Sequence, residues 1–158
     1  MTLPRSARRV EEALRALGLP AEVRELDDST RTAPEAAAAV GCELGAIVKS
    51  LVFRGADSGD PVLVLVSGDR RGDEASISAA VGERVERADA DFVRSVTGYA
   101  IGGVPPVGHP APLRTLMDDG LLRFDEVWAA AGTPRAVFGV EPGRLAGAIG
   151  VVPGPVAS

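Results

Sequence analysis

A five-residue run, Val62-Leu-Val-Leu-Val66, carries an apolar side chain at every position. In a β-strand, successive side chains point to opposite faces of the sheet, so this strand has to be covered on both sides. The turn-forming stretch 57–61 precedes it, and a second apolar run, 45–53, precedes that turn. Two such runs around a short polar turn predict a hairpin. The chain is therefore expected to build a sheet around a central, buried strand.

Helix and strand signals surround this hairpin. Ser6 and Thr32 are predicted to cap two helices, and Gly41 follows the second one. Helices are expected at 6–17, 34–40, 73–81, 89–96 and 142–149, and strands at 21–26, 83–87 (an edge strand), 99–101, 113–117, 126–130 and 136–140. The strands cluster and do not alternate strictly with helices, which favours a mixed α+β fold over a doubly wound one. Surrounding helices and a partly closed, barrel-like sheet are expected.

The length of 158 residues fits a single domain, expected to span 1–158. The Pro/Gly-containing stretch 151–158 is predicted to be a flexible tail. One cysteine, Cys42, leaves no internal disulfide and no metal-binding cluster. No secretory signal or membrane-length apolar run is visible, so the expected location is cytoplasmic, without a membrane partner. A net charge of −5 argues against a broad grip on nucleic acid, although recognition of one terminal nucleotide is compatible with it.

Lys49 is the one lysine among seventeen Lys and Arg residues. With a period of two, it shares a strand face with Ile47, Leu51 and Phe53, the more apolar face, which should point inward. An ammonium there has to be paired, line a cleft or meet an anionic ligand. The alternative is an edge position from which the head reaches solvent. Lysine offers a compact point charge where arginine offers a wide planar fork, so the two are not interchangeable.

The loop Gly102-Gly-Val-Pro-Pro-Val-Gly108 is the second notable feature. Adjacent glycines allow close backbone approach to a ligand, and the two prolines stiffen the rest of the loop. The spacing is neither a dinucleotide fingerprint nor a phosphate loop, and a plain connecting loop would also use Gly and Pro. His109, the one histidine, is more typical of a surface residue, and Cys42 of a packing residue. No catalytic triad or carboxylate pair is apparent.

Three segments, taken in order, resemble the YbaK-like family of free-standing aminoacyl-tRNA deacylases and the editing domain inserted in bacterial prolyl-tRNA synthetases. They are Ile47-Val-Lys-Ser-Leu-Val-Phe53, Thr97-Gly-Tyr-Ala-Ile-Gly-Gly-Val-Pro-Pro-Val-Gly108 and Ala129-Ala-Ala-Gly-Thr-Pro-Arg-Ala-Val-Phe138. The similarity extends over about residues 30–145. It implies a mixed fold built round a partly closed sheet. It also implies hydrolysis of the ester between a mischarged amino acid and the terminal ribose of tRNA.

The resemblance assigns roles to particular residues. Lys49 matches the family's essential lysine and would engage the phosphate or ribose of the terminal adenosine. Gly102, with Gly103, would orient the attacking water or the substrate's own hydroxyl. Pro106 would hold the loop in shape. Further substrate-binding residues are expected to line the pocket or to set its size: Ser50, Thr97, Ala130, Ala131 and Gly132.

The same resemblance implies a small amino acid such as Ala or Cys, carried on tRNA-Pro, and no metal or cofactor. The implied partners are the aminoacylated acceptor end of tRNA and prolyl-tRNA synthetase, and a homodimer is a further option. Two rival readings stay open. One is a module on the same fold that binds aminoacyl-tRNA, a nucleotide or a protein without catalysis. The other uses Lys49 as a Schiff-base nucleophile.

Overall fold

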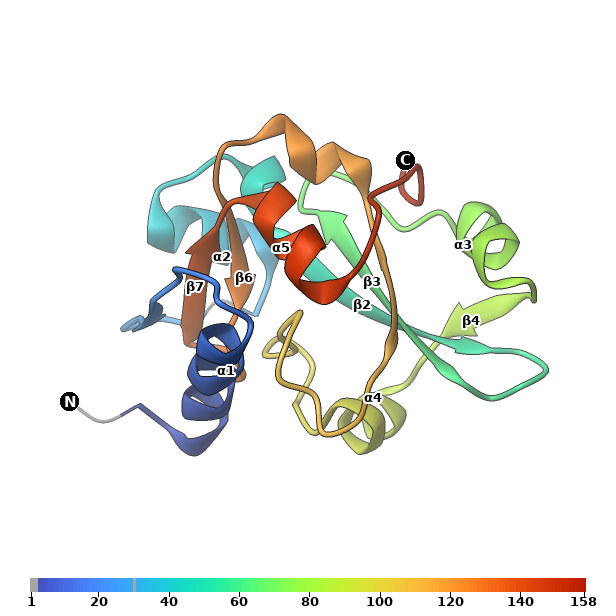
Figure 1. Ribbon diagram of the computed structural model, residues 1–158, viewed down its shortest axis with the longest axis horizontal. Helices are drawn as coiled ribbons and strands as arrows, with labels where there is room; N and C mark the ends of the chain where they lie inside the picture. The colour runs from blue at the N-terminus through green and yellow to red at the C-terminus, as the bar shows by residue number, and fades with distance from the viewer. Residues whose placement is uncertain (1–2, 30) are drawn as a thin grey trace.

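The predicted hairpin lies at the centre of the computed structural model, which describes residues 3–29 and 31–158. Strand β2 (Val48–Gly55) pairs antiparallel with β3 (Pro61–Ser67), with Lys49 opposite Val66. Figure 1 shows these two long strands crossing the middle of the molecule. The five apolar positions of β3 are all buried. The hairpin and its covered central strand are confirmed.

The strands form two sheets. In the first, the order is β4-β2-β3-β5, where β4 (Val85–Arg87) is an antiparallel edge strand, as predicted, and β5 (Arg114–Met117) runs parallel to β3. In the second, β7 (Ala136–Val140) pairs antiparallel with both β1 (Val23–Glu25) and β6 (Val127–Ala130). The mixed α+β fold is confirmed.

The sheets do not close into one barrel. Between β2 and β6, one isolated parallel bridge joins Ile47 to Trp128, at the start of β2. A single bridge does not continue the hydrogen-bonded ladder that closure requires. The expected barrel-like closure is therefore not confirmed in the described part of the chain. The region where the two sheets meet is nevertheless important, because a pocket opens there.

Among the described residues, five α-helices cover the sheets: α1 (Arg5–Ala16), α2 (Ala33–Val40), α3 (Glu74–Val81), α4 (Ala90–Thr97) and α5 (Pro142–Ile149). Helix α2 has a capping box, in which Thr32 Oγ1 accepts from the Glu35 N–H and Glu35 Oε1 accepts from the Thr32 N–H. The Thr32 cap and the Gly41 C-cap are confirmed. The Ser6 cap is wrong, since α1 begins after Pro4 without a side-chain cap.

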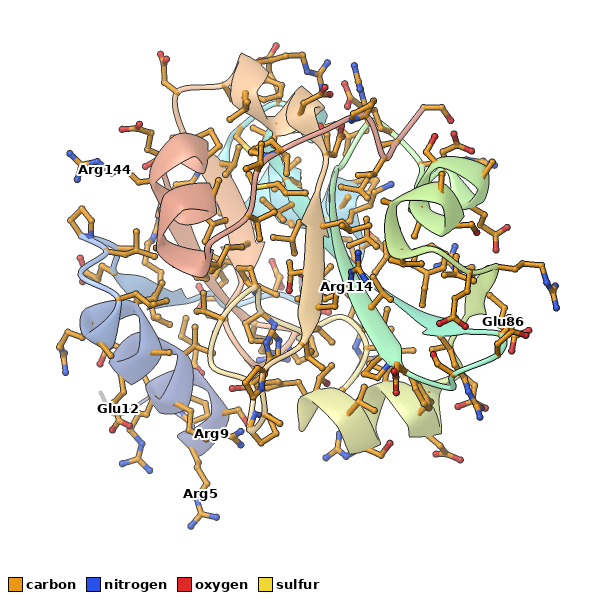
Figure 2. The ribbon with its side chains drawn as sticks, turned by 45° about the vertical axis from the view of Figure 1, so that its right-hand side comes forward. Arg5, Arg9, Glu12, Glu86, Arg114 and Arg144 are labelled. Atoms are coloured by element: carbon orange, nitrogen blue, oxygen red, sulfur yellow. The ribbon has the colours of Figure 1, made fainter. Side chains whose placement is uncertain are left out.

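The two faces of the hairpin pack against different partners. On one face, Val52 and Leu63 join the larger core with Leu14 of α1. On the other, Phe53 and Val64 pack with Ile77 of α3, among others, in a smaller cluster. Arg114 of β5, labelled in Figure 2, links this strand to α3. Its guanidinium donates to the Ala80 carbonyl of α3 at 2.8 Å. Covering both faces explains why β3 is apolar throughout.

Two segments differ from expectation. Residues 99–101 form bends and turns and no strand, because Thr97 ends α4 and Gly102 turns the chain at a φ of +90°. The segment 151–158, expected to be flexible, is held in place. Val156 is buried, and the Ser158 and Arg71 main chains exchange two hydrogen bonds of 2.9 and 3.0 Å. Buried apolar area and backbone pairing fasten this segment to the domain.

Two short 3₁₀ helices, η1 (Leu44–Ala46) and η2 (Asp119–Arg123), complete the described elements. No helix among the described residues has the length and apolar character needed to cross a membrane. On α1, Figure 2 shows Arg5 extending away from the fold. Arg9 instead packs over the Tyr99 ring, 5.0 Å from its centroid. The basic residues of α1 are thus partly a solvated face and partly packing residues.

Candidate functional site

A pocket of about 260 Å³ lies between α2, the start of β2, the Gly102 loop and strand β6. Its walls are mostly apolar, formed by alanines of α2, by Ile47 and by Trp128. Polar groups enter from Lys49, Ser50 and the residues at the start of α2. Small concave sites that are apolar with a few polar groups are typical of small-ligand binding. The pocket can hold a small side chain beside a cation and a hydroxyl.

Lys49 lies on the edge of this pocket and is half-buried. Its ammonium donates a hydrogen bond to the main-chain carbonyl of Arg70, in the turn after β3. Burial, and then the positive charges of Arg71 and Arg87, lower the pKa of Lys49 below its usual value. In the described part of the chain, no carboxylate lies within ion-pair distance of this ammonium. The ammonium is thus held by a neutral acceptor at the edge of the pocket.

The face carrying Lys49 is not the one that builds the larger core. Leu51 and Phe53, which share its face, pack with the smaller cluster under α3, whereas Val48 and Val52 on the opposite face belong to the larger core. The inward-facing assignment of Lys49 is therefore correct only in part. Both faces of β2 are covered, and the lysine reaches the pocket because it lies near the strand's beginning.

Ser50 also lines the pocket, from the strand face opposite to Lys49. Its Oγ is buried and has no hydrogen-bond partner among the described residues. A buried hydroxyl without a partner is uncommon in native structures and costs about 1–3 kcal/mol of stability. A ligand with a polar group in the pocket would satisfy it. The structure therefore brings Lys49 and Ser50 to one pocket, and their contact with a substrate stays a prediction.

Gly102 forms another wall of the pocket. Its φ of +90° favours glycine, and a Cβ at this position would lie 3.2 Å from Cγ of Arg31. Gly103 follows Gly102 but is not among the residues that line the pocket. Its carbonyl accepts a hydrogen bond of 2.9 Å from the Gly132 N–H, and a Cβ on it would lie 3.0 Å from Cα of Thr133. Main-chain contacts thus fix the Gly102 loop against residues 131–133.

Tyr99 and His109 hold the remainder of this loop. The Tyr99 hydroxyl donates to the Gly108 carbonyl at 2.6 Å, and the two rings contact edge to face. His109 Nε2 lies 2.8 Å from the Pro105 carbonyl, so this nitrogen carries the proton. Burial lowers the pKa of His109. His109 is partly buried and supports the loop, so it is less exposed than the surface residue that the sequence favoured.

The other predicted site residues lie outside the pocket lining, with one exception. Thr97 is fully buried at the end of α4, where its hydroxyl donates to the Val93 carbonyl and accepts from the Tyr99 N–H. Pro106 and Ala131 are buried. Gly132 packs against α1, since a Cβ on it would lie 2.7 Å from the Ser6 carbonyl oxygen. Ala130, by contrast, lines the pocket. Substrate contact by Thr97, Gly103, Pro106, Ala131 and Gly132 stays a prediction.

Sequence reasoning did not place α2, Arg31 or Trp128 at the site. The run of alanines in α2 is a usable signal, because small side chains leave room beside a helix. Trp128 carries no comparable signal, since a tryptophan in a strand is ordinary core material. Its position at the pocket follows from the bridge to Ile47, which is a tertiary contact.

Comparison with known proteins bears directly on this site. The family described as aminoacyl-tRNA editing domain matches residues 27–148, which include Lys49 and Gly102. A solved structure described as a candidate trans-editing enzyme for prolyl tRNA synthetase is 49% identical, has a TM-score of 0.92 and covers 99% of each chain. In Bacillus subtilis (strain 168), the uncharacterised protein YwhH is 33% identical over 78% of this chain and 78% of its own length.

A further relative is EbsC of Enterococcus faecalis (strain ATCC 700802 / V583), named as a candidate Cys-tRNA(Pro)/Cys-tRNA(Cys) deacylase. It is 27% identical over 73% of this chain and 75% of its own length. The family match spans most of the chain and includes all the residues that line the pocket. The chain therefore belongs to the aminoacyl-tRNA editing domain family, which confirms the family and the editing function predicted from its motifs.

Proposed function

We propose that this editing domain acts in trans and removes a small amino acid, such as Ala or Cys, from mischarged tRNA-Pro. The observation that carries the proposal is the meeting of a lysine held by a main-chain carbonyl and a positive-φ glycine at one small apolar pocket. The names of two relatives support it. One is described as a candidate trans-editing enzyme for prolyl tRNA synthetase, and the other as a candidate deacylase of Cys-tRNA(Pro).

Lys49 engages the phosphate or ribose of the terminal adenosine. A compact ammonium suits this task, because its three donors can reach one carbonyl and a ligand oxygen together. The amino-acid side chain enters the apolar part of the pocket, between α2 and Trp128. The volume of about 260 Å³ favours a small side chain over a large one. Ser50 supplies a hydrogen bond to a polar group of the aminoacyl moiety.

Hydrolysis then needs a positioned water and no protein nucleophile. The water oxygen bonds to the ester carbonyl carbon, the bond from that carbon to the ribose oxygen breaks, and a proton ends on the ribose oxygen. Gly102 orients the water, or the substrate hydroxyl that activates it, through its main chain. Because an aminoacyl ester is already reactive, positioning and electrostatic stabilisation can supply much of the acceleration. A site without a triad or metal cluster is consistent with this reaction.

The partners follow from the same reaction. The aminoacylated acceptor end of tRNA is the substrate, and prolyl-tRNA synthetase is the enzyme whose products this domain checks, in the cytoplasm. A separate hydrolytic step is useful because small amino acids differ too little in binding energy for a synthetase to distinguish them in one selection step. The net charge of −5 implies a weak hold on the body of the tRNA. The proposal also includes a homodimer, which a measurement of molecular mass in solution would test.

The test is a deacylation screen. Wild-type protein and Lys49→Arg are incubated with Ala-, Cys- and Ser-tRNA-Pro, and with Pro-tRNA-Pro as the correctly charged control. We expect release of Ala or Cys, no release of Pro, and at least about a tenfold loss of kcat/KM in Lys49→Arg, because the wide fork does not fit a point-charge site. Circular dichroism verifies that both proteins are folded.

The rival readings give different results in the same screen. Tight binding of these tRNAs without release would show a non-catalytic module. A covalent adduct at Lys49 after borohydride treatment would show a Schiff-base nucleophile. Wild-type rates in Lys49→Ala would refute every catalytic use of this lysine.

A further inference from the structure

The acceptor of the Lys49 hydrogen bond lies in a turn that a buried carboxylate organises. Lys49 donates to the Arg70 carbonyl, in the turn 68–71 after β3. Lys49 belongs to the neighbouring strand β2, opposite Val66, so the turn lies beside the lysine's own strand. The position of the ammonium at the pocket edge therefore depends on where this turn places one main-chain oxygen.

Asp118 contacts Ser67, directly before this turn, and Arg70, within it. Its side chain is fully buried, at the end of β5. Oδ2 accepts from the N–H of Ser67, the last residue of β3, at 3.2 Å. Oδ1 lies 3.4 Å from Nη1 of Arg70 and accepts from the Gly120 N–H at 2.9 Å. One carboxylate thus joins the start of the turn to the side chain of the residue whose carbonyl holds Lys49.

The Arg70 side chain has little freedom to move away from this contact. It packs over Gly120 so closely that a Cβ there would lie 2.9 Å from Cζ of Arg70. A second carboxylate, Asp119, lies 4.0 Å from Nη1 but is half exposed. An ion pair with a fully buried partner is costly to break, because it leaves one charge buried and alone. The Arg70 main chain is also held by its own N–H, which donates to the Ser67 carbonyl at 3.0 Å, and Asp118 is the fully buried carboxylate that holds the Arg70 side chain.

We infer that Asp118 is a positioning residue for Lys49, and that it acts through Arg70 and the turn 68–71. The inference rests on the proposed function, in which Lys49 contacts the substrate. It goes beyond that function because Asp118 is not among the residues that line the pocket. A buried ion pair with a purely structural role would stabilise the fold and leave the place of the lysine head unchanged, which separates the two readings experimentally.

The test uses the fact that the chain contains one lysine. Protein labelled with ¹³C at lysine Cε gives a single signal that reports Lys49 without assignment. Asp118→Asn keeps the shape of the side chain but removes its charge. We expect the Lys49 signal to shift toward that of a free lysine side chain. We also expect kcat/KM on mischarged tRNA to fall about 10- to 100-fold, the loss typical of a displaced catalytic group.

Asp119→Asn is the matched control, since it removes the adjacent, half-exposed carboxylate. It should leave the Lys49 signal in place and kcat/KM within about twofold of wild type, as expected for an exposed ion pair. The charge of Asp118 also raises the pKa of Lys49 directly, so a moved signal in Asp118→Asn alone does not prove displacement. Arg70→Gln keeps this carboxylate and removes only the ion pair, so it is the second variant and the one that decides between the two effects. Arg70→Gln should give the same shift, and the double variant should be no worse than the worse single one, because both changes act on one contact.

A folded Asp118→Asn protein with an unmoved Lys49 signal would overturn the inference, whether or not its activity falls. A moved signal with wild-type kcat/KM would overturn it as well. The signal requires no substrate, so it tests the positioning independently of deacylation. Absence of deacylation by the wild type would refute the proposed function and leave the structural link between Asp118 and Lys49 to be judged by the signal.

Discussion

The charged ammonium of Lys49 donates a hydrogen bond to an acceptor that carries no charge, the main-chain carbonyl of Arg70. Burial opposes the ammonium, and the guanidinium groups of Arg71 and Arg87 oppose it further, while the Arg70 carbonyl and the more distant charges of Asp69 and Asp118 favour it. Because burial has the largest effect, an anionic ligand at the pocket would stabilise this cation more than it would stabilise an ordinary surface lysine. This makes the state of the lysine measurable by pH.

We predict that Lys49 loses its proton at a lower pH than a free lysine side chain. Its pKa is lowered by burial, so the cation is fully present well below that pKa and is lost as the pH rises through it. In the protein labelled at lysine Cε, titration should give a midpoint below that of free lysine. Binding of deacylated tRNA should weaken over the same pH range. A midpoint at or above the free value would contradict the assignment of Lys49 to a desolvated site.

Ser50 allows a prediction in which stability and activity change in opposite directions. Ser50→Ala removes a buried hydroxyl that has no partner among the described residues. The free energy of unfolding should stay the same or rise by up to about 1 kcal/mol, because a desolvated polar group is removed. Deacylation should slow several-fold if the hydroxyl meets the substrate. Chemical denaturation and a deacylation assay measure the two effects.

Val52→Ala is the comparison for Ser50→Ala, since Val52 is a buried neighbour on the same face of β2. It should lower stability by about 1–3 kcal/mol through lost burial and a cavity, without a specific loss of activity in the folded protein. A Ser50→Ala protein that is less stable than wild type and fully active would show that Ser50 is an ordinary packing residue.

At the scale of the elements, the Gly102 loop presents its backbone to the pocket because neighbouring segments hold it from behind. Gly103 binds residue 132, Tyr99 binds Gly108, and His109 binds Pro105. These contacts leave Gly102 in the left-handed region with its main chain exposed to the pocket. The element acts as one rigid wall, which is the property that positioning of water requires.

The Gly102→Ala substitution should therefore reduce deacylation activity more than it reduces stability. The positive φ costs about 1 kcal/mol for a residue with a Cβ, and this Cβ would also press on Arg31 at 3.2 Å. We expect kcat/KM to fall at least about tenfold, since the loop has to shift at the reacting centre. The deacylation assay and thermal melting give the two numbers.

Gly82→Ala is a closely matched control. Gly82 has a φ of +87°, nearly that of Gly102, and a Cβ there would meet nothing within 4 Å. It ends α3, away from the pocket lining. Gly82→Ala should show a similar loss of stability and normal kcat/KM. Equal losses of activity in both variants would mean that backbone strain alone, and not contact with the pocket, explains the effect.

At the scale of the whole molecule, the hairpin is covered on both faces by parts of the chain that are far apart in sequence. Residues 153–158 complete the cover on the α3 side, where Val156 packs with Phe53, Val64 and Ile77. The same segment pairs with the main chain of Arg71, in the turn whose Arg70 carbonyl accepts from Lys49. Stability and the lysine's surroundings are thus linked through this segment.

Val156→Ala should lower the free energy of unfolding by about 1–2 kcal/mol, the loss expected for removing two methyl groups from a buried site. Val152→Ala is the control, because the Val152 side chain is 90% exposed and should contribute nothing measurable. Denaturant titration compares both variants with wild type. Equal stability of the Val156→Ala protein and wild type would show that the segment is loosely attached, as its sequence suggested.

Local signals made the α2 helix and the hairpin predictable from sequence, and they singled out Lys49 and Gly102, which line one pocket. Thr32, Glu35 and Gly41 satisfy the ends of α2 within a few residues, and an apolar β3 needs only its own pattern to be recognised as central. The motifs around Lys49 and Gly102 sufficed for the family. These features depend on residues that are neighbours along the chain.

The tertiary structure alone decided the features that depend on distant segments. Residues 99–101 look like a strand until the partners of Tyr99 and Gly102, which are Gly108 and Arg31, are known. The segment 151–158 looks flexible until Val156 packs against β2 and β3. The sequence by itself determined that a lysine would meet a glycine-rich loop. Which carbonyl accepts from that lysine, and which carboxylate contacts the side chain of the same residue, depended on long-range contacts, because no local pattern encodes the packing of β5 beside β3.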